Sequence, residues 1–151
     1  KDIGFTHTEY QQSFNRNLFF LHYPDGVVKT EFTYFPFTRI EKAMRRGALE
    51  IDSLRDIAVN KVFTIAQQTR ARDFIDLFFI LKKEPWTIPQ LRGDARVKFD
   101  SHIDFVHFGA QLLKAGEAKD MPRMVIPIKK DDVESFFAQA AASLKNEILQ
   151  Q

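Results

Sequence analysis

The chain of 151 residues contains no cysteine, which excludes disulfide cross-links, thiolate metal sites and thiol catalysis. Its longest uninterrupted apolar stretch runs only from Leu77 to Leu81, far below the ~20 residues that cross a bilayer as a helix. The six glycines are scattered, and none forms a phosphate-binding Gly-x-x-x-x-Gly-Lys loop or a Gly-x-Ser-x-Gly element. No signal-peptide pattern opens the chain. These absences predict a cytoplasmic protein without a membrane segment.

The chain contains 22 Lys and Arg and 20 Asp and Glu, so neither sign of charge is in large excess. A net charge of +2 does not by itself indicate a nucleic-acid-binding protein. One basic cluster stands out, comprising Arg39, Lys42, Arg45 and Arg46. If this stretch is helical, its spacing places the cations on one face. That face is either a solvated surface or a patch that contacts phosphates, and the salt dependence of binding separates the two.

Phenylalanine is abundant, with 16 copies, and 44% of the chain is hydrophobic. The first third is typical of β structure. Two strands, Leu18–Tyr23 and Val27–Phe37, flank the turn sequence Pro24-Asp25-Gly26 and predict a hairpin. The second strand carries the carboxylate Glu31, and Pro36 indicates that this strand ends there or lies at an edge.

The rest of the chain is typical of helices, so we expect an α+β fold with a short β segment followed by a helical bundle. Capping signals and apolar periodicity predict these helices. They are 53–68, 72–83, 87–99, 103–113 and one from Asp131 onward with an apolar stripe at Val133, Phe136, Phe137, Ala140, Leu144 and Ile148.

Two charged residues interrupt apolar helical patterns. Lys61 falls inside the stripe of the helix from Ser53, and a buried lysine requires a carboxylate partner. The next helix is apolar nearly all round from Phe74 to Leu81, except for Asp76, and Asp73 shares its face. These residues form either a structural ion-pair network or the polar wall of an active site. Two simpler alternatives are a helix-dipole contact of Asp73 and an i,i+4 pair of Asp76 with Arg72.

The four histidines, in contrast, show no spacing along the chain that suits a metal. Only His102 and His107 lie close together, and a separation of five residues aligns them poorly on a helix. We therefore do not expect a histidine metal site.

The stretch from Ser53 to Lys61, followed by Arg72-Asp73-Phe74-Ile75-Asp76-Leu77, resembles the signature of the AbiEii/AbiGii-type nucleotidyltransferases. These are toxins of type IV toxin–antitoxin systems in the polymerase-β superfamily. Their pattern is an acidic-Ile/Leu-Ala-x-x-Lys helix followed by Arg-Asp-x-x-Asp-Leu. Similar family features are Lys29-Thr30-Glu31-Phe32 with Phe35-Pro36-Phe37, and Met121-Pro122 with the closing Phe136-Phe137 helix.

The resemblance implies a Mg²⁺-dependent transfer of a nucleotide from a nucleoside triphosphate to an RNA (in some members tRNA) or protein hydroxyl. Lys61 would approach the triphosphate, and Asp73 and Asp76 would orient Lys61 or transfer a proton. Arg72 and Arg70 would support binding of the nucleotide, with Arg70 substituting for an arginine that the family often has at Gln68. Glu31 would be a metal ligand, and a cognate antitoxin would be a partner.

One departure from the family is the missing first motif, Gly-Ser followed by Asp-x-Asp, whose carboxylates hold the metals. We therefore expect a C-terminal portion of such an enzyme, with ~70 further residues before Lys1 as the family's layout implies. Residues 1–52 would be the end of the nucleotidyltransferase β core, and residues 53–151 the helical domain with the lysine and Arg-Asp-x-x-Asp motifs. The alternative is a non-catalytic helical module that binds RNA or a partner protein.

Overall fold

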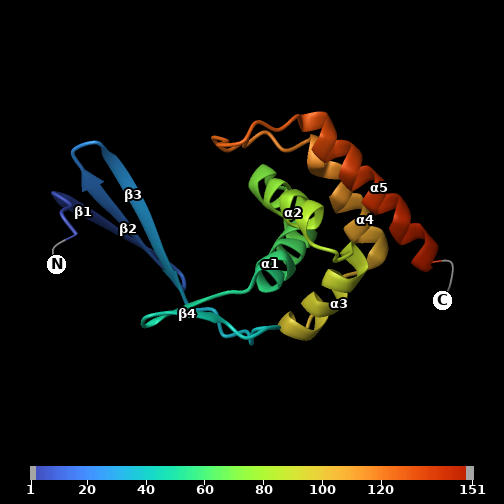
Figure 1. Cartoon of the computed structure of the whole chain (residues 1–151), viewed down its shortest axis with the longest axis horizontal. Helices are drawn as coiled ribbons and strands as arrows, with labels where there is room; N and C mark the ends of the chain where they lie inside the picture. Colours follow the sequence, from blue (N-terminus) through green and yellow to red (C-terminus); the bar gives the residue numbers. More distant parts are fainter. Residues whose placement is uncertain (1–2, 149–151) are drawn as a thin grey trace. The chain divides into compact units, whose positions relative to one another are not determined.

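The computed structural model describes residues 3–148, with side chains described as far as Lys145. Small antiparallel sheets precede a set of helices, which confirms the predicted α+β class (Figure 1). The contacts divide the chain after Phe37 into two compact units. We call them the sheet unit, before this point, and the helical unit, after it. The functional division at residues 52 and 53 stays a prediction.

The sheet unit is a three-stranded antiparallel sheet in the order β1-β2-β3. Strands β2 (Arg16–Tyr23) and β3 (Gly26–Thr33) form the predicted hairpin, in which Tyr23 pairs with Gly26. Strand β3 lies at an edge of this sheet and ends before Pro36, as a proline without an N–H group requires. Strand β1 (His7–Ser13) was not predicted, because its polar sequence lacks the apolar alternation of a half-buried strand.

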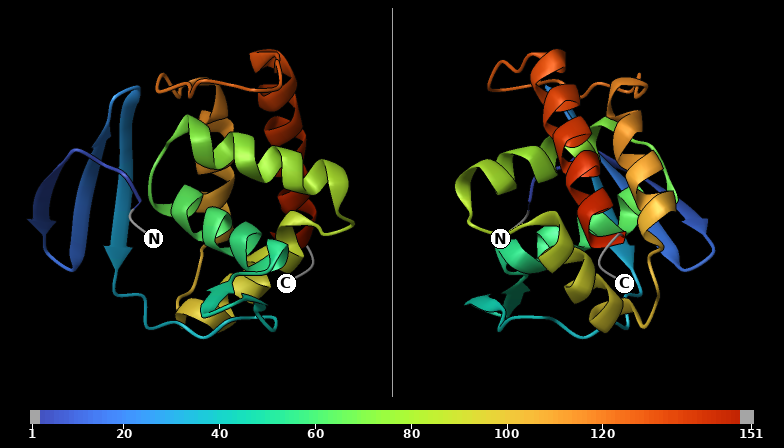
Figure 2. Two further views of the ribbon diagram at one scale, coloured as in Figure 1. Left: turned by 60° about the vertical axis from the view of Figure 1, so that its left-hand side comes forward. Right: turned by 90° about the vertical axis from the view of Figure 1, so that its right-hand side faces the viewer.

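The helical unit begins with a short hairpin of β4 (Met44–Arg46) and β5 (Leu49–Ile51), which the sequence analysis also missed. The predicted helices are all present, with small differences at their ends. Their bounds are α1 (Leu54–Gln67), α2 (Ala71–Lys83), α3 (Ile88–Phe99), α4 (Phe105–Leu113) and α5 (Lys130–Ile148), with a 3₁₀ turn at Lys114–Gly116 (Figures 1 and 2). The side chain of Ile148 lies outside the described part. Among the described residues, no helix is both long and apolar enough to traverse a bilayer.

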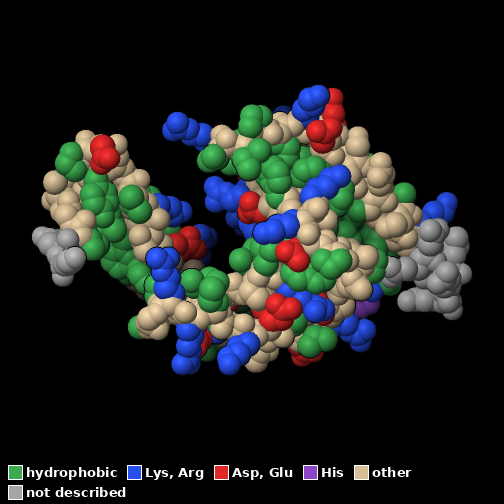
Figure 3. Space-filling view, viewed as in Figure 1, with side chains coloured by type: hydrophobic (Ala, Val, Ile, Leu, Met, Phe, Trp, Pro, Cys, Tyr) green, Lys and Arg blue, Asp and Glu red, His purple; other side chains and the backbone are tan. Residues whose placement is uncertain are grey.

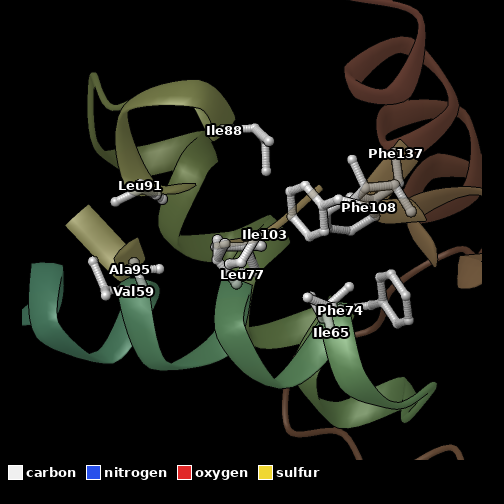
Figure 4. Packing of buried hydrophobic residues seen from close by; sticks show 14 of the residues in the cluster. Val59, Ile65, Phe74, Leu77, Ile88, Leu91, Ala95, Ile103, Phe108 and Phe137 are labelled. Carbon is white, nitrogen blue, oxygen red and sulfur yellow. The ribbon is translucent and has the colours of Figure 1, made fainter. Parts of the chain in front are cut away.

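The core of the helical unit lies where the helices meet, and its largest side chains come from three of them (Figure 4). Phe74 of α2, Phe108 of α4 and Phe137 of α5 are almost completely buried. The rings of Phe74 and Phe137 meet edge to face at a centroid distance of 5.1 Å. Burial of each such side chain contributes roughly 1.5–3 kcal/mol, so this packing stabilises α2 against α5.

The start of α1 is anchored by Asp56, whose side chain is completely buried. The Ser53 hydroxyl caps the helix by accepting the Asp56 N–H, and it donates to the Asp56 carboxylate at 2.9 Å. The same carboxylate accepts the backbone N–H groups of Ile40 and Glu41, at 2.8 and 3.0 Å, and Lys98 Nζ of α3 at 2.6 Å. Asp56 therefore joins the chain before β4, the first turn of α1 and the end of α3.

The burial of Asp56 predicts a loss of stability in acid. Burial alone raises the pKa of a carboxyl, but the hydrogen bonds from Lys98 and from the Ile40 and Glu41 N–H groups outweigh it. They lower the pKa of Asp56 from 3.8 to about 2. A carboxyl with a lower pKa in the folded protein than in the unfolded chain stabilises the fold at every pH above its unfolded pKa. For Asp56 this stability is lost as the pH falls from about 4 toward 2. Urea unfolding at pH 6, 4 and 3 should therefore show a smaller pH dependence in Asp56→Asn than in the wild type. An unchanged dependence would contradict this role.

Candidate active site at Lys61

Lys61 has the carboxylate partners that its position in an apolar stripe requires. Its Nζ donates to Asp73 Oδ1 at 2.8 Å and to Asp76 Oδ2 at 2.6 Å. The lysine lies on α1 and both aspartates lie on α2, one helical turn apart, so that the packing of α1 on α2 brings the three together. We call these three residues the lysine triad. No ion pair joins Arg72 to Asp76, both of which the structure describes, so that simpler alternative is wrong.

The two aspartates of the lysine triad differ in their access to solvent. The side chain of Asp73 is only 9% exposed, whereas that of Asp76 is 44% exposed and that of Lys61 is 19% exposed. Asp73 is thus the buried carboxylate, and Asp76, which the sequence placed in the interior or in a cleft, borders solvent. The remaining oxygen of Asp73, Oδ2, is shielded from solvent and accepts no hydrogen bond from the described residues. A buried oxygen without a hydrogen-bond donor is costly, and such atoms are uncommon in folded proteins.

The two carboxylate partners of Lys61 favour its charged form. Burial lowers the pKa of an ammonium group, but the hydrogen bonds to Asp73 and Asp76 outweigh it and leave the pKa of Lys61 above 10.5. A lysine with a raised pKa is protonated at neutral pH and does not serve as a general base or an amine nucleophile. Its contribution is therefore electrostatic, and the anions that it binds in this structure are the carboxylates of Asp73 and Asp76.

The predicted nucleotide-binding arginines stand on either side of Ala71, the first residue of α2. Arg70 Nε lies 3.8 Å from Asp73 Oδ2, and its side chain is half exposed. Arg72 is exposed on the first turn of the helix. Both cations can therefore meet a ligand from solvent, and their binding role stays a prediction.

Glu31 belongs to the sheet unit, where it is held by an arginine. Arg16 Nε and Nη2 donate to the two oxygens of Glu31 at 2.7 and 2.9 Å, and the Thr33 hydroxyl donates at 3.1 Å. The hydrogen bond from Arg16 lowers the pKa of Glu31 to about 2, so that Glu31 is ionised at neutral pH. Its predicted role as a metal ligand stays a prediction.

The basic cluster is not helical, which corrects the conditional expectation of one cationic face. Arg39 and Lys42 lie in the chain before β4, and Arg45 and Arg46 lie in that strand. Arg39 is paired with Asp52 at 2.7 Å and with Glu50 at 3.0 Å, and Arg45 is also paired with Glu50. Basic and acidic side chains are interspersed on the face of the helical unit that Figure 3 shows. The geometry favours a solvated surface over a phosphate-binding patch.

Comparison with known proteins identifies the family. The profile described as "Nucleotidyl transferase AbiEii toxin, Type IV TA system" matches residues 6–147, which include the whole lysine triad. The chain belongs to the AbiEii nucleotidyltransferase toxin family. It is also 28% identical over 114 residues to the uncharacterised protein aq_aa25 of Aquifex aeolicus, a match that covers 75% of this chain. The same match covers 55% of that relative, so the chain spans about half its length. No solved structure matches significantly.

The family's description names a nucleotidyltransferase toxin of a type IV toxin–antitoxin system. Sequence reasoning found the lysine triad because a charge inside an apolar stripe is visible locally. It missed the pair of Asp56 and Lys98, which are 42 residues apart. One sign of this pair was present in the sequence. Lys98 precedes the apolar Phe99 near the end of the predicted helix 87–99.

Proposed function

We propose that the lysine triad is the phosphate-binding side of a nucleotidyltransferase site, which takes a nucleoside triphosphate and transfers its nucleotide to an RNA or protein hydroxyl. The observation that carries the proposal is a lysine ammonium group, partly open to solvent, that two carboxylates bind at 2.6–2.8 Å. Membership of the AbiEii family supports the same reaction class.

Each member of the lysine triad has a distinct role in this proposal. Lys61 attracts the triphosphate as a point charge, and the buried Asp73 positions its ammonium group. Asp76 borders solvent and is therefore the carboxylate available to accept a proton from the acceptor hydroxyl. The acceptor oxygen forms a bond to the α-phosphorus, the bond from that phosphorus to the bridging oxygen breaks, and pyrophosphate leaves. Arg70 and Arg72 offset the two negative charges of the aspartates.

With the contacts that they make in this structure, Glu31, Asp73 and Asp76 do not offer the oxygen ligands that a magnesium ion requires. Magnesium requires oxygen ligands in near-octahedral geometry. Arg16 occupies both oxygens of Glu31, and Lys61 already binds one oxygen of each aspartate. We therefore assign no step to a metal held by these residues. The resemblance implies Mg²⁺, and the transfer assay below is run with and without it.

The natural acceptor of the nucleotide and the partner that controls the enzyme are also part of the proposal. The family's type IV toxin–antitoxin description supports a cognate antitoxin as partner. For the acceptor, tRNA and a protein hydroxyl are the two candidates that the assay compares.

A transfer assay tests the proposal directly. The whole protein that contains this chain is incubated with each α-labelled nucleoside triphosphate and with tRNA or cell protein, and incorporated label is measured. We expect label in one acceptor with the wild type and a rate at least about 100-fold lower with Lys61→Ala. The matched control is Lys83→Ala, which alters an exposed lysine at the end of α2 and should leave transfer unchanged. Transfer at the wild-type rate by Lys61→Ala would overturn the site assignment.

A further inference from the structure

Three metal-ligating side chains converge on one face of the sheet unit, far along the sequence from the lysine triad. His7 and Glu9 are two residues apart on β1, so both point to the same side of the strand. His22 of β2 is the direct cross-strand partner of His7. One ligand atom from each of the three residues lies within 4.8 Å of the others. Because the sheet register creates this cluster, spacing along the chain did not reveal it.

The contacts inside the cluster resemble those between ligands of one ion. His22 Nε2 lies 3.1 Å from Glu9 Oε1, yet it is shielded from solvent and forms no hydrogen bond among the described residues. Two ligand atoms bound at 2.0–2.1 Å in a tetrahedral zinc site are separated by roughly 3.3 Å. The imidazoles of His7 and His22 are also adjacent, with ring centroids 5.2 Å apart. To share one ion, the three ligand atoms, which lie within 4.8 Å of one another, must approach to roughly 3.3 Å, and the side chains of His7 and Glu9 are exposed.

The strand end that carries His22 is held in place. Thr6 donates two hydrogen bonds to the His22 carbonyl oxygen, from its N–H at 2.8 Å and from its hydroxyl at 3.1 Å. The site is therefore built on paired strands rather than on a loop, which favours a defined ligand geometry.

We propose that His7, Glu9 and His22 bind one zinc ion, with water in the fourth position. Two imidazoles and one carboxylate suit zinc, whereas magnesium requires a set of oxygen ligands. The ion joins the edge strand β1 to β2 and stabilises the sheet unit. This proposal does not depend on the proposed nucleotidyltransferase chemistry.

Zinc titration of the full chain, prepared without a histidine tag, tests the proposal. We expect one Zn²⁺ bound per chain in isothermal titration calorimetry, with micromolar or tighter affinity, and no binding of Mg²⁺ at this site. His22→Ala and Glu9→Gln should weaken binding by more than the roughly 10–100-fold caused by loss of a residue hydrogen-bonded to a metal ligand. Glu9 is half exposed, so Glu9→Gln should fold normally. The matched control His102→Ala, an exposed histidine elsewhere, should bind like the wild type.

Hydrogen exchange provides a readout of where the ion acts. Zinc should slow amide exchange in β1 and β2 of the wild type, leave α5 unchanged, and have no effect on the sheet of His22→Ala. Absence of zinc binding by the wild type would overturn the proposal. It would also be overturned by one-to-one binding that survives both His22→Ala and Glu9→Gln.

Discussion

Replacement of Lys98 by methionine is expected to lower the free energy of unfolding by about 3–5 kcal/mol. The Lys98 side chain is 1% exposed, and that of its partner Asp56 is completely buried. Their contact at 2.6 Å compensates two charges that water does not reach. Removal of the ammonium group leaves a buried carboxylate without its cation, and this cost exceeds that of the lost hydrogen bond. Urea unfolding followed by circular dichroism measures the difference.

Two further variants control this experiment. Lys83→Met changes an exposed lysine in α2 and should alter the unfolding free energy by less than about 0.5 kcal/mol. The double variant Asp56→Asn/Lys98→Met removes both charges and should be more stable than Lys98→Met alone, because an amide oxygen can still accept the Ile40 N–H. If Lys98→Met were as stable as the wild type, Asp56 would not depend on this lysine.

Lys61→Met should give the opposite balance between stability and activity. We expect the nucleotide transfer rate to fall by roughly 10²–10³-fold, as when one preorganised electrostatic contact is removed from an active site. The loss of unfolding free energy should be only about 1–2 kcal/mol, because Asp76 borders solvent and Arg70 stands 3.8 Å from the buried oxygen of Asp73. Transfer assays and urea unfolding of the same preparations measure both effects.

Comparison of the two lysine variants separates an active site from a structural ion pair. Both replace a lysine bound to aspartate in the helical unit, and they differ mainly in burial. If Lys61→Met destabilised the protein as much as Lys98→Met, and the wild type transferred no nucleotide, the lysine triad would be structural. The chain would then fit the alternative of a non-catalytic binding module.

Much of the local structure could be predicted because its causes are local. The turn at Pro24-Asp25-Gly26 predicted the hairpin, and the cap at Ser53 predicted the start of α1. The helix predicted over 87–99 begins at a capping box of Thr87 and Gln90. Each of these signals depends on residues within a few positions of one another, so the order of the helices needed no knowledge of the fold.

The candidate site was only partly predictable. A lysine inside an apolar stripe predicted a carboxylate partner, and Asp73 and Asp76 on the next helix were the nearest candidates. Their different burial was not predictable, because it depends on which side of α2 the other helices cover. The condition that the basic cluster be helical is not met, since spacing of three and four residues alone does not distinguish a helix from the loop and strand observed there.

The sequence by itself determined the class of the fold, the existence of the helices and the need of Lys61 for a partner, because periodicity, capping and the cost of buried charge act over short distances. Only the tertiary structure decided that Lys98 reaches Asp56 and that His7, Glu9 and His22 share one face of a sheet. These contacts join residues that are distant in the chain. Their pairing follows from helix packing and strand register, which the whole fold establishes.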